Sequence, residues 1–267
     1  MTKKILLSFV NKGYMSTQRF LQEATESNFF DNIIIKNEDD IPEFIEKHKN
    51  FIKSNKSGYG CWIWKPKIII DTLNSMKDGD FLIYCDAGSH INKNGHLQFN
   101  HYLNTLSHEK PIGVFSTTSN YTVKNFVKRD AIMHYYPEFD VKEDQTYVYA
   151  GLMIIKKNNF SLNFIKEWLE LCENYNFLDR SISKNFKEKR KFFIGNDCDA
   201  GLFALCTVKH KENICYLGKD EIMVYSKDGV QYHHLDKKQQ RLLNWETLQN
   251  KPFQARRLTP KLYRHIS

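Results

Sequence analysis

The sequence lacks any apolar run long enough to cross a membrane. Its N-terminal run, Ile5 to Val10, is too short for the core of a signal peptide and far too short to span a bilayer. We interpret this run as a first buried strand. The composition therefore predicts a soluble, cytoplasmic protein that is at most peripheral to a membrane.

Glycine and proline are scarce as well, with 12 Gly and 6 Pro in 267 residues. No stretch of them is long enough to form a linker, so we expect one globular domain rather than two domains joined by a tether. Six cysteines occur, at positions 61, 85, 172, 198, 206 and 215, and no two of them form a CxxC pair. This spacing argues against a disulfide framework or a zinc site and favours reduced thiols.

Basic residues exceed acidic ones, 39 to 31, which gives a net charge of +8 at pH 7. The densest basic stretch is Lys184–Lys191, and a second group lies between Arg256 and Arg264. Such an excess suits nucleic acid, an anionic membrane or a phosphate-bearing ligand, or it is a solvated surface. Lys and Arg do not cluster with aromatic residues in a recognition motif, and acidic residues are interleaved, so we expect no nucleic-acid partner.

Hydrophobic periodicity predicts strands that alternate with helices. Strands are expected at residues 4–10, 32–36, 80–85, 112–115, 146–155 (with a break at Ala150-Gly151), 214–217 and 222–225. Helices are expected at residues 16–27, 41–54, 66–76, 97–107, 123–135, 160–175 and 200–208. This order predicts an α/β fold in which helices flank a largely parallel sheet. Ligands in such sheets bind at the carboxyl ends of the strands, where Asp86 falls.

The segment Gly79–Gly88 is the most informative part of the chain. It predicts a buried strand that ends on a carboxylate and is followed at once by small residues. Ala87 and Gly88 leave room for a diphosphate, and Asp86 offers a hard oxygen ligand to Mg²⁺ or Mn²⁺. The alternative interpretation is that Asp86 only caps the next turn.

A second motif, Gly58–Pro66, lies upstream and contains Trp62, Trp64 and Lys65. The two indole rings and a lysine at a helix start would form an aromatic wall with a cation facing phosphate. A helix N-terminus also favours anions through its free N–H groups. Alternatively, the tryptophans are core anchors beside a solvated lysine.

These two motifs carry a resemblance to a known family. The runs Gly-Tyr-Gly-Cys-Trp-Ile-Trp-Lys-Pro (58–66) and Asp-Gly-Asp-Phe-Leu-Ile-Tyr-Cys-Asp-Ala-Gly (78–88) resemble a group of GT-A fold glycosyltransferases found among bacterial and large-virus polysaccharide-building proteins. The resemblance implies a GT-A-like (Rossmann-like) domain over residues 1–235. It also implies transfer of a sugar from a nucleotide-diphosphate donor, UDP by default, to a hydroxyl of a glycan or glycolipid acceptor in capsule, lipopolysaccharide or similar synthesis.

The resemblance further implies a divalent cofactor, Mn²⁺ or Mg²⁺. The GT-A metal motif is Asp-x-Asp, and the matching triplet here is Tyr84-Cys85-Asp86, so Asp86 alone matches. GT-A enzymes frequently complete the metal shell with a histidine near the C-terminus, which indicates His233 or His234. Imidazole and carboxylate together suit Mn²⁺. Without the resemblance, the alternative interpretation is that these two histidines are exposed to solvent or hydrogen-bonded within the core.

Other matching positions receive roles in donor binding and catalysis. Arg129 and Asp130 resemble the helix residues that reach the donor diphosphate and the sugar hydroxyls, although they are also consistent with an ordinary surface pair. Asp130 is therefore a candidate catalytic residue. The candidate donor-binding residues are Ser8, Phe9, Trp64, Lys65, Asp86, Ala87, Gly88, Arg129, Ala150 and Gly151.

Asp199 is the best candidate for a catalytic base. An inverting transferase needs a carboxylate that takes the proton of the acceptor hydroxyl, and family relatives often carry an Asp at this position. The alternative is that Asp199 caps the helix beginning at Ala200. A non-catalytic domain that binds a nucleotide sugar or carbohydrate is the rival function. We expect residues 236–267 to form a basic tail that packs on the domain or contacts an anionic inner membrane.

Overall fold

The computed structural model describes residues 2–12, 17–116, 121–139, 147–186, 192–219 and 251–254. Its centre is a six-stranded sheet with the strand order β2-β1-β3-β6-β5-β7. The strands are β1 (Lys4–Phe9), β2 (Asn32–Lys36), β3 (Phe81–Cys85), β5 (Ile112–Ser116), β6 (Val148–Lys156) and β7 (Ile214–Lys219). The pairs β1–β2, β1–β3 and β5–β7 are parallel, whereas β6 runs antiparallel to β3 and β5. The predicted α/β fold with a largely parallel sheet is confirmed.

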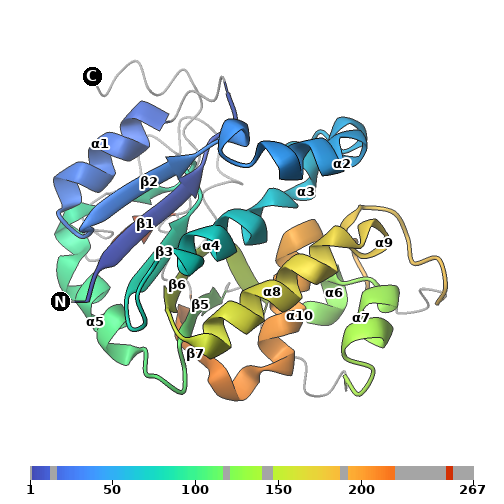
Figure 1. The fold of residues 1–267 in the computed structure, drawn as a ribbon. Helices are drawn as coiled ribbons and strands as arrows, with labels where there is room; N and C mark the ends of the chain where they lie inside the picture. The colour runs from blue at the N-terminus through green and yellow to red at the C-terminus, as the bar shows by residue number, and fades with distance from the viewer. Residues whose placement is uncertain are drawn as a thin grey trace, which may run out of the picture.

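Helices cover both faces of the sheet, as Figure 1 shows. Because side chains alternate along a strand, Leu6 of β1 packs on one face while Ile5 and Leu7 pack on the other. The first face is covered by α1 (Thr17–Ser27) and α5 (His96–Thr105), and the second by α2 (Pro42–Ser54), α4 (Trp64–Asn74), α8 (Asn159–Glu173) and α10 (Cys198–Lys209). The shorter elements are η1 (Glu38–Asp40), α3 (Gly58–Cys61), η2 (Lys93–Gly95), α6 (Val123–Phe126), α7 (Arg129–Tyr135), α9 (Tyr175–Leu178) and η4 (Lys211–Asn213).

The helix predicted over residues 123–135 is two helices, α6 and α7. Val127 and Lys128 leave the helical conformation, with ψ angles of 130° and 142°. The break has a cause in tertiary structure, because the fully buried Lys128 ammonium bonds to the Asn176 carbonyl, Asp179 and the Ser181 hydroxyl. Continuing the helix would carry this ammonium away from those partners.

The strand predicted to break at Ala150-Gly151 is continuous through both residues, but its pairing with β5 shifts register between Val148 and Met153. Gly151 has no positive φ angle and therefore makes no turn. A Cβ atom at this position would lie 2.3 Å from the Tyr149 ring. The glycine leaves room for that ring, and so it does not interrupt the strand.

A small antiparallel sheet joins β4 (His90–Ile91) to β8 (Phe253–Gln254). Phe253 is buried against Phe99 of α5, with ring centroids 5.9 Å apart. Four residues of the predicted C-terminal tail, 251–254, are thus part of the described fold, whereas its basic group Arg256–Arg264 and the strand expected at 222–225 lie outside the described residues.

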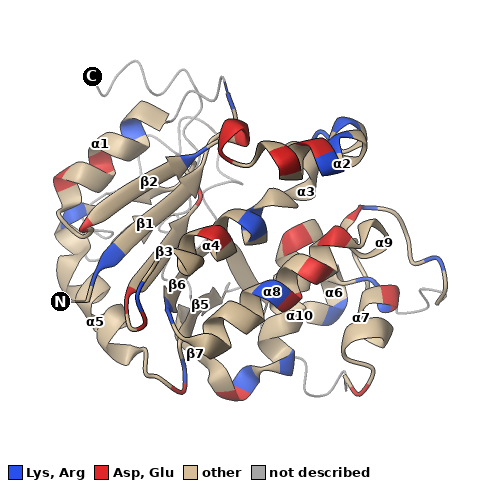
Figure 2. Ribbon diagram, viewed as in Figure 1, with Lys and Arg blue, Asp and Glu red and all other residues tan. Residues whose placement is uncertain are grey.

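Charged residues of both signs share the same helices, as Figure 2 shows for α2 and α8. No helix within the described ranges is long and apolar enough to cross a membrane. All six cysteines are buried free thiols.

Candidate active site

A cavity of about 190 Å³ lies where the carboxyl end of β3, the start of β6 and the starts of α4 and α10 meet. β1 and β3 are parallel neighbours, so their carboxyl ends share this edge of the sheet, and the Ser8 hydroxyl there donates to the Cys85 carbonyl at 2.6 Å. The cavity is lined by Trp62, Lys65, Asp86, Tyr147, Val148, Tyr149, Ala150, Gly151, Asp197, Asp199 and Ala200.

The Lys65 ammonium lies at the centre of the polar wall. Its Nζ is 3.0 Å from Asp199 Oδ2 and 3.7 Å from Asp86 Oδ1, and it donates to the Ala150 carbonyl at 3.3 Å. Only 4% of its side chain is exposed. Burial alone would lower the pKa of Lys65, but Asp199 and Asp86 outweigh it and the pKa is raised. Lys65 is therefore a permanent buried cation shared by two carboxylates.

A left-handed turn places Lys65 at this point. Every residue from Gly58 to Trp62 has a positive φ angle, between 52° and 86°. Three of them, Tyr59, Cys61 and Trp62, are not glycine, although left-handed backbone costs such residues about 1–2 kcal/mol each. The turn ends directly before α4, whose first turn contains Lys65, and the Trp64 indole N–H donates back to the Gly58 carbonyl at 3.0 Å.

Replacing Gly60 by alanine should therefore destabilise the protein more than the same change at Gly79. Both glycines have nearly the same φ angle, 86° and 87°, but a Cβ at Gly60 would lie 2.6 Å from the Ile52 side chain, whereas a Cβ at Gly79 meets nothing within 4 Å. Backbone strain costs each variant about 1–2 kcal/mol, and overpacking costs Gly60→Ala roughly 1–3 kcal/mol more. Urea unfolding measures both; equal losses would mean that the turn is not packed as described.

Asp199 is the second residue of α10 and is 2% exposed. Burial raises its pKa to about 7, although Lys65 opposes the shift; Asp197 and Asp86 add to it. The peptide at this position is fixed because the Trp168 indole N–H donates to the Asp199 carbonyl at 3.0 Å. A carboxyl group that titrates near neutral pH can accept a proton from a substrate hydroxyl under ordinary conditions.

Asp86 follows β3 and is held from two sides. The Tyr84 hydroxyl donates to its Oδ1 at 2.6 Å, and its own backbone N–H donates to the Gly151 carbonyl at 2.8 Å. Its side chain is 22% exposed and lines the cavity, so one part of the carboxylate faces any bound ligand.

The cavity contains residues to which the sequence analysis gave no role. Asp197 accepts a hydrogen bond from the Tyr147 hydroxyl at 2.8 Å, and burial raises the Asp197 pKa. Tyr147 and Tyr149 both line the cavity, but Tyr147 packs in the cluster on one face of the sheet and Tyr149 in the cluster on the other, so strand alternation would not have identified them. Of the two tryptophans predicted to form an aromatic wall, Trp62 lines the cavity and Trp64 does not.

The described residues do not by themselves complete the expected metal site. The Asp86 carboxylate already accepts from Tyr84 and lies beside the Lys65 ammonium. Within the part of the chain that the structure describes, no group of three or more His, Cys, Asp or Glu side chains is placed to hold a metal ion. His233 and His234 lie outside the described residues.

Several expected donor-binding residues lie near the cavity without lining it. Phe9 and Trp64 stack on each other with ring centroids 3.9 Å apart, and both are buried in the core. Ser8 is bonded to Cys85, as described above. Ala87 and Gly88 form the turn after Asp86, where the Ala87 carbonyl accepts from Arg19 at 2.9 Å.

Arg129 and Asp130 are not among the residues that line the cavity. The Asp130 carboxylate accepts the backbone N–H groups of Lys184, Asn185 and Phe186, which fixes the segment following α9. The structure thus gives Asp130 a structural task at the first turn of α7 and does not bring it to Asp86 and Asp199.

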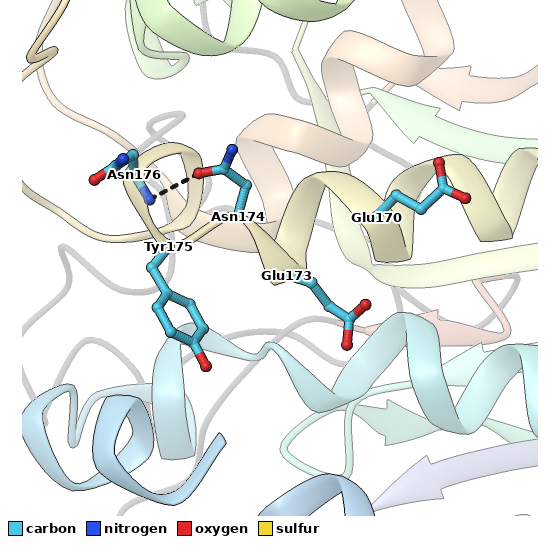
Figure 3. A pocket seen from close by; sticks show the side chains of 5 residues that line it. All are labelled: Glu170, Glu173, Asn174, Tyr175 and Asn176. Atoms are coloured by element: carbon cyan, nitrogen blue, oxygen red, sulfur yellow. Dashed lines mark hydrogen bonds between the residues drawn. The ribbon is translucent and has the colours of Figure 1, made fainter. Parts of the chain in front are cut away.

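A second hollow, of about 530 Å³, is lined by Glu170, Glu173, Asn174, Tyr175 and Asn176 (Figure 3). Although it is larger, two of its side chains already bind α2. Glu173 pairs with Lys47 and His48, and the Tyr175 ring stacks on Phe51 at 4.3 Å. These contacts join α2 to α8 and α9, so we assign the chemistry to the smaller cavity around Lys65.

No protein-family model matches this sequence. A search of curated proteins also finds no match. Among solved structures, mouse xyloside xylosyltransferase 1 in its apo form is similar at a TM-score of 0.47 and 12% identity, covering 96% of this chain and 95% of that one. A glycosyltransferase involved in glycosylation of the major capsid of PBCV-1 is similar at 0.36 and 12%, covering 64% of this chain and 67% of that one.

A third similar structure is mannose-6-phosphate isomerase from Helicobacter pylori, at a TM-score of 0.34 and 10% identity, covering 64% of this chain and 76% of that one. At these identities and TM-scores, no family membership follows.

Proposed function

We propose that this protein is a glycosyltransferase that moves a sugar from a nucleoside-diphosphate donor to a hydroxyl group of a glycan acceptor. The observation that carries this proposal is the buried Lys65 ammonium held between Asp86 and Asp199 in a cavity at the carboxyl edge of parallel strands. Ligands of open α/β sheets bind at that edge.

The size and lining of the cavity favour a single sugar ring as its occupant. Its volume of about 190 Å³ is well below the roughly 300–1,000 Å³ of pockets that enclose drug-sized ligands. Carboxylates accept hydrogen bonds from hydroxyl groups, and the rings of Trp62, Tyr147 and Tyr149 offer apolar surface to the C–H face of a sugar. The nucleoside diphosphate would then extend from the cavity mouth.

Each polar residue has a role in the proposed reaction. Asp86 accepts hydrogen bonds from the sugar hydroxyls and orients the ring. Asp199 takes the proton from the acceptor hydroxyl as that oxygen attacks the anomeric carbon, and the bond to the nucleoside diphosphate breaks. Lys65 supplies positive charge beside the reacting groups, where the leaving group gains negative charge. These roles describe an inverting displacement.

The raised pKa of Asp199 favours a catalytic function over simple carbohydrate binding. A binding site needs carboxylates only as hydrogen-bond acceptors, which an ordinary ionised Asp provides. Here burial raises the Asp199 pKa to about 7, close to the value at which a general base works best at neutral pH. This shift supports a proton-transfer role for Asp199.

Replacing Asp86 by asparagine should weaken binding of the sugar donor by about tenfold to a hundredfold, because a charged hydrogen bond contributes roughly 1.5–3 kcal/mol. Calorimetric titration with a panel of sugar nucleotides measures the loss. Asp71→Asn is the matched control, because Asp71 of α4 is 30% exposed, pairs with Lys67 and is not among the residues that line the cavity. Absence of binding by every sugar nucleotide would refute the proposed function.

A further inference from the structure

Four segments of the chain meet at the Lys65 ammonium. Lys65 comes from α4, Asp86 from the end of β3, and Asp199 from the start of α10, while the Ala150 carbonyl of β6 accepts a hydrogen bond from the ammonium. The ammonium also lies 5.3 Å from the Tyr84 ring centroid and 5.9 Å from that of Trp62. Its charge is thus surrounded by acceptors and aromatic faces.

A divalent ion that bound both Asp86 and Asp199 would have to lie where the Lys65 ammonium lies. An ion bridging two carboxylates approaches an oxygen of each to about 2.0–2.2 Å. The Lys65 nitrogen already lies between the two carboxylates, 3.0 Å from one and 3.7 Å from the other. A bridging ion would therefore approach the buried ammonium within a few ångströms, and two cations at that distance repel strongly where water is excluded.

We propose that Lys65 is the resident cation of this site and that the protein binds its donor without a divalent metal. The inference deepens the proposed function and rests on it for the identity of the ligand. It reverses the expectation drawn from Asp86 and the His233-His234 pair. It also gives a physical reason for Tyr84 at the position where the Asp-x-Asp motif has its first acid: the Tyr84 hydroxyl donates to Asp86, whereas an acid would repel it.

Lys65 differs from a metal in what it can do. An ammonium donates hydrogen bonds and supplies one positive charge, but it accepts no lone pair from a phosphate oxygen as a metal does. It is attached to a helix, so the charge stays in the site when the product leaves. We therefore expect the protein purified in the presence of a chelator to be active without added metal.

Counting Mn²⁺ ions bound by the full chain tests this inference without any substrate. Equilibrium dialysis should give the same number for the natural protein, for Asp86→Asn, for the double variant His233→Ala/His234→Ala, and for the control Asp71→Asn. The inference would be overturned if the natural protein and Asp71→Asn each bound one more Mn²⁺ ion than Asp86→Asn or the histidine variant.

A second measurement needs no variant. The affinity for UDP, titrated once in EDTA and once in millimolar Mn²⁺, should be unchanged, whereas tightening by about tenfold or more in Mn²⁺ would overturn the inference. If neither UDP nor any other nucleoside diphosphate binds, the proposed function fails, and the Mn²⁺ count still decides whether the site holds a metal. The two failures are thereby distinguished.

Discussion

Replacing Asp199 by asparagine is expected to lower the rate of sugar transfer by about 10²–10⁴-fold, the range that a positioned general base contributes. Asparagine has nearly the same shape but cannot take the acceptor proton. The effect should fall on kcat, because Asp86 and the aromatic walls that hold the sugar are unchanged. Steady-state kinetics measures kcat and KM for the donor, and far-UV circular dichroism verifies that the variant is folded.

The pH dependence of kcat gives this prediction a second readout. Asp199 must be ionised to act as a base, so kcat should rise as pH increases through about 7, the value to which burial raises its pKa. The charged groups that face it are Lys65 from α4, Asp86 after β3 and Asp197 at the start of its own helix. A kcat that is unchanged in Asp199→Asn, or flat between pH 5 and pH 9, would remove Asp199 from the mechanism.

Replacing Lys65 by methionine is expected to lower the free energy of unfolding by about 3–5 kcal/mol at pH 8. Removing one partner of a buried ion pair leaves the other charge uncompensated, and methionine restores the volume but not the charge. The loss should be smaller at pH 5, because Asp199, with a pKa of about 7, is then mostly protonated and attracts Lys65 less. Urea unfolding at the two pH values measures both effects.

The matched control for this variant is Lys67→Met on the same helix. Lys67 pairs with Asp71 at 2.6 Å, but 32% of its side chain is exposed, so we expect a loss of only about 0–1 kcal/mol. Equal losses for the two variants would show that Lys65 is not the buried counter-ion of Asp86 and Asp199.

Local sequence signals located the elements that build the site. The apolar run before Asp86 identified β3 and its carboxyl end, and Pro66 indicated the first turn of α4. Hydrophobic periodicity predicts these elements because each of them buries one face, so its apolar residues recur with the period of a strand or a helix.

The chemistry within the cavity was less accessible to the sequence. Lys65 was expected to face a phosphate, but the structure places it against Asp199, a residue far away in the chain. The left-handed turn before it involves Tyr59, Cys61 and Trp62, whose residue types disfavour that backbone. Tertiary packing overrides local preference at both points, and no local pattern reports such packing.

The most direct test of the central claim is release of nucleoside diphosphate from a panel of sugar nucleotides, with water or an added glycan as acceptor. The assay compares the natural protein with Asp199→Asn and with Lys67→Met, in Mn²⁺ and separately in EDTA. A glycosyltransferase centred on this cavity predicts turnover of at least one donor by the natural protein and by Lys67→Met, with a loss of about 10²-fold or more in Asp199→Asn. Turnover of no donor, or equal turnover by Asp199→Asn, would contradict it.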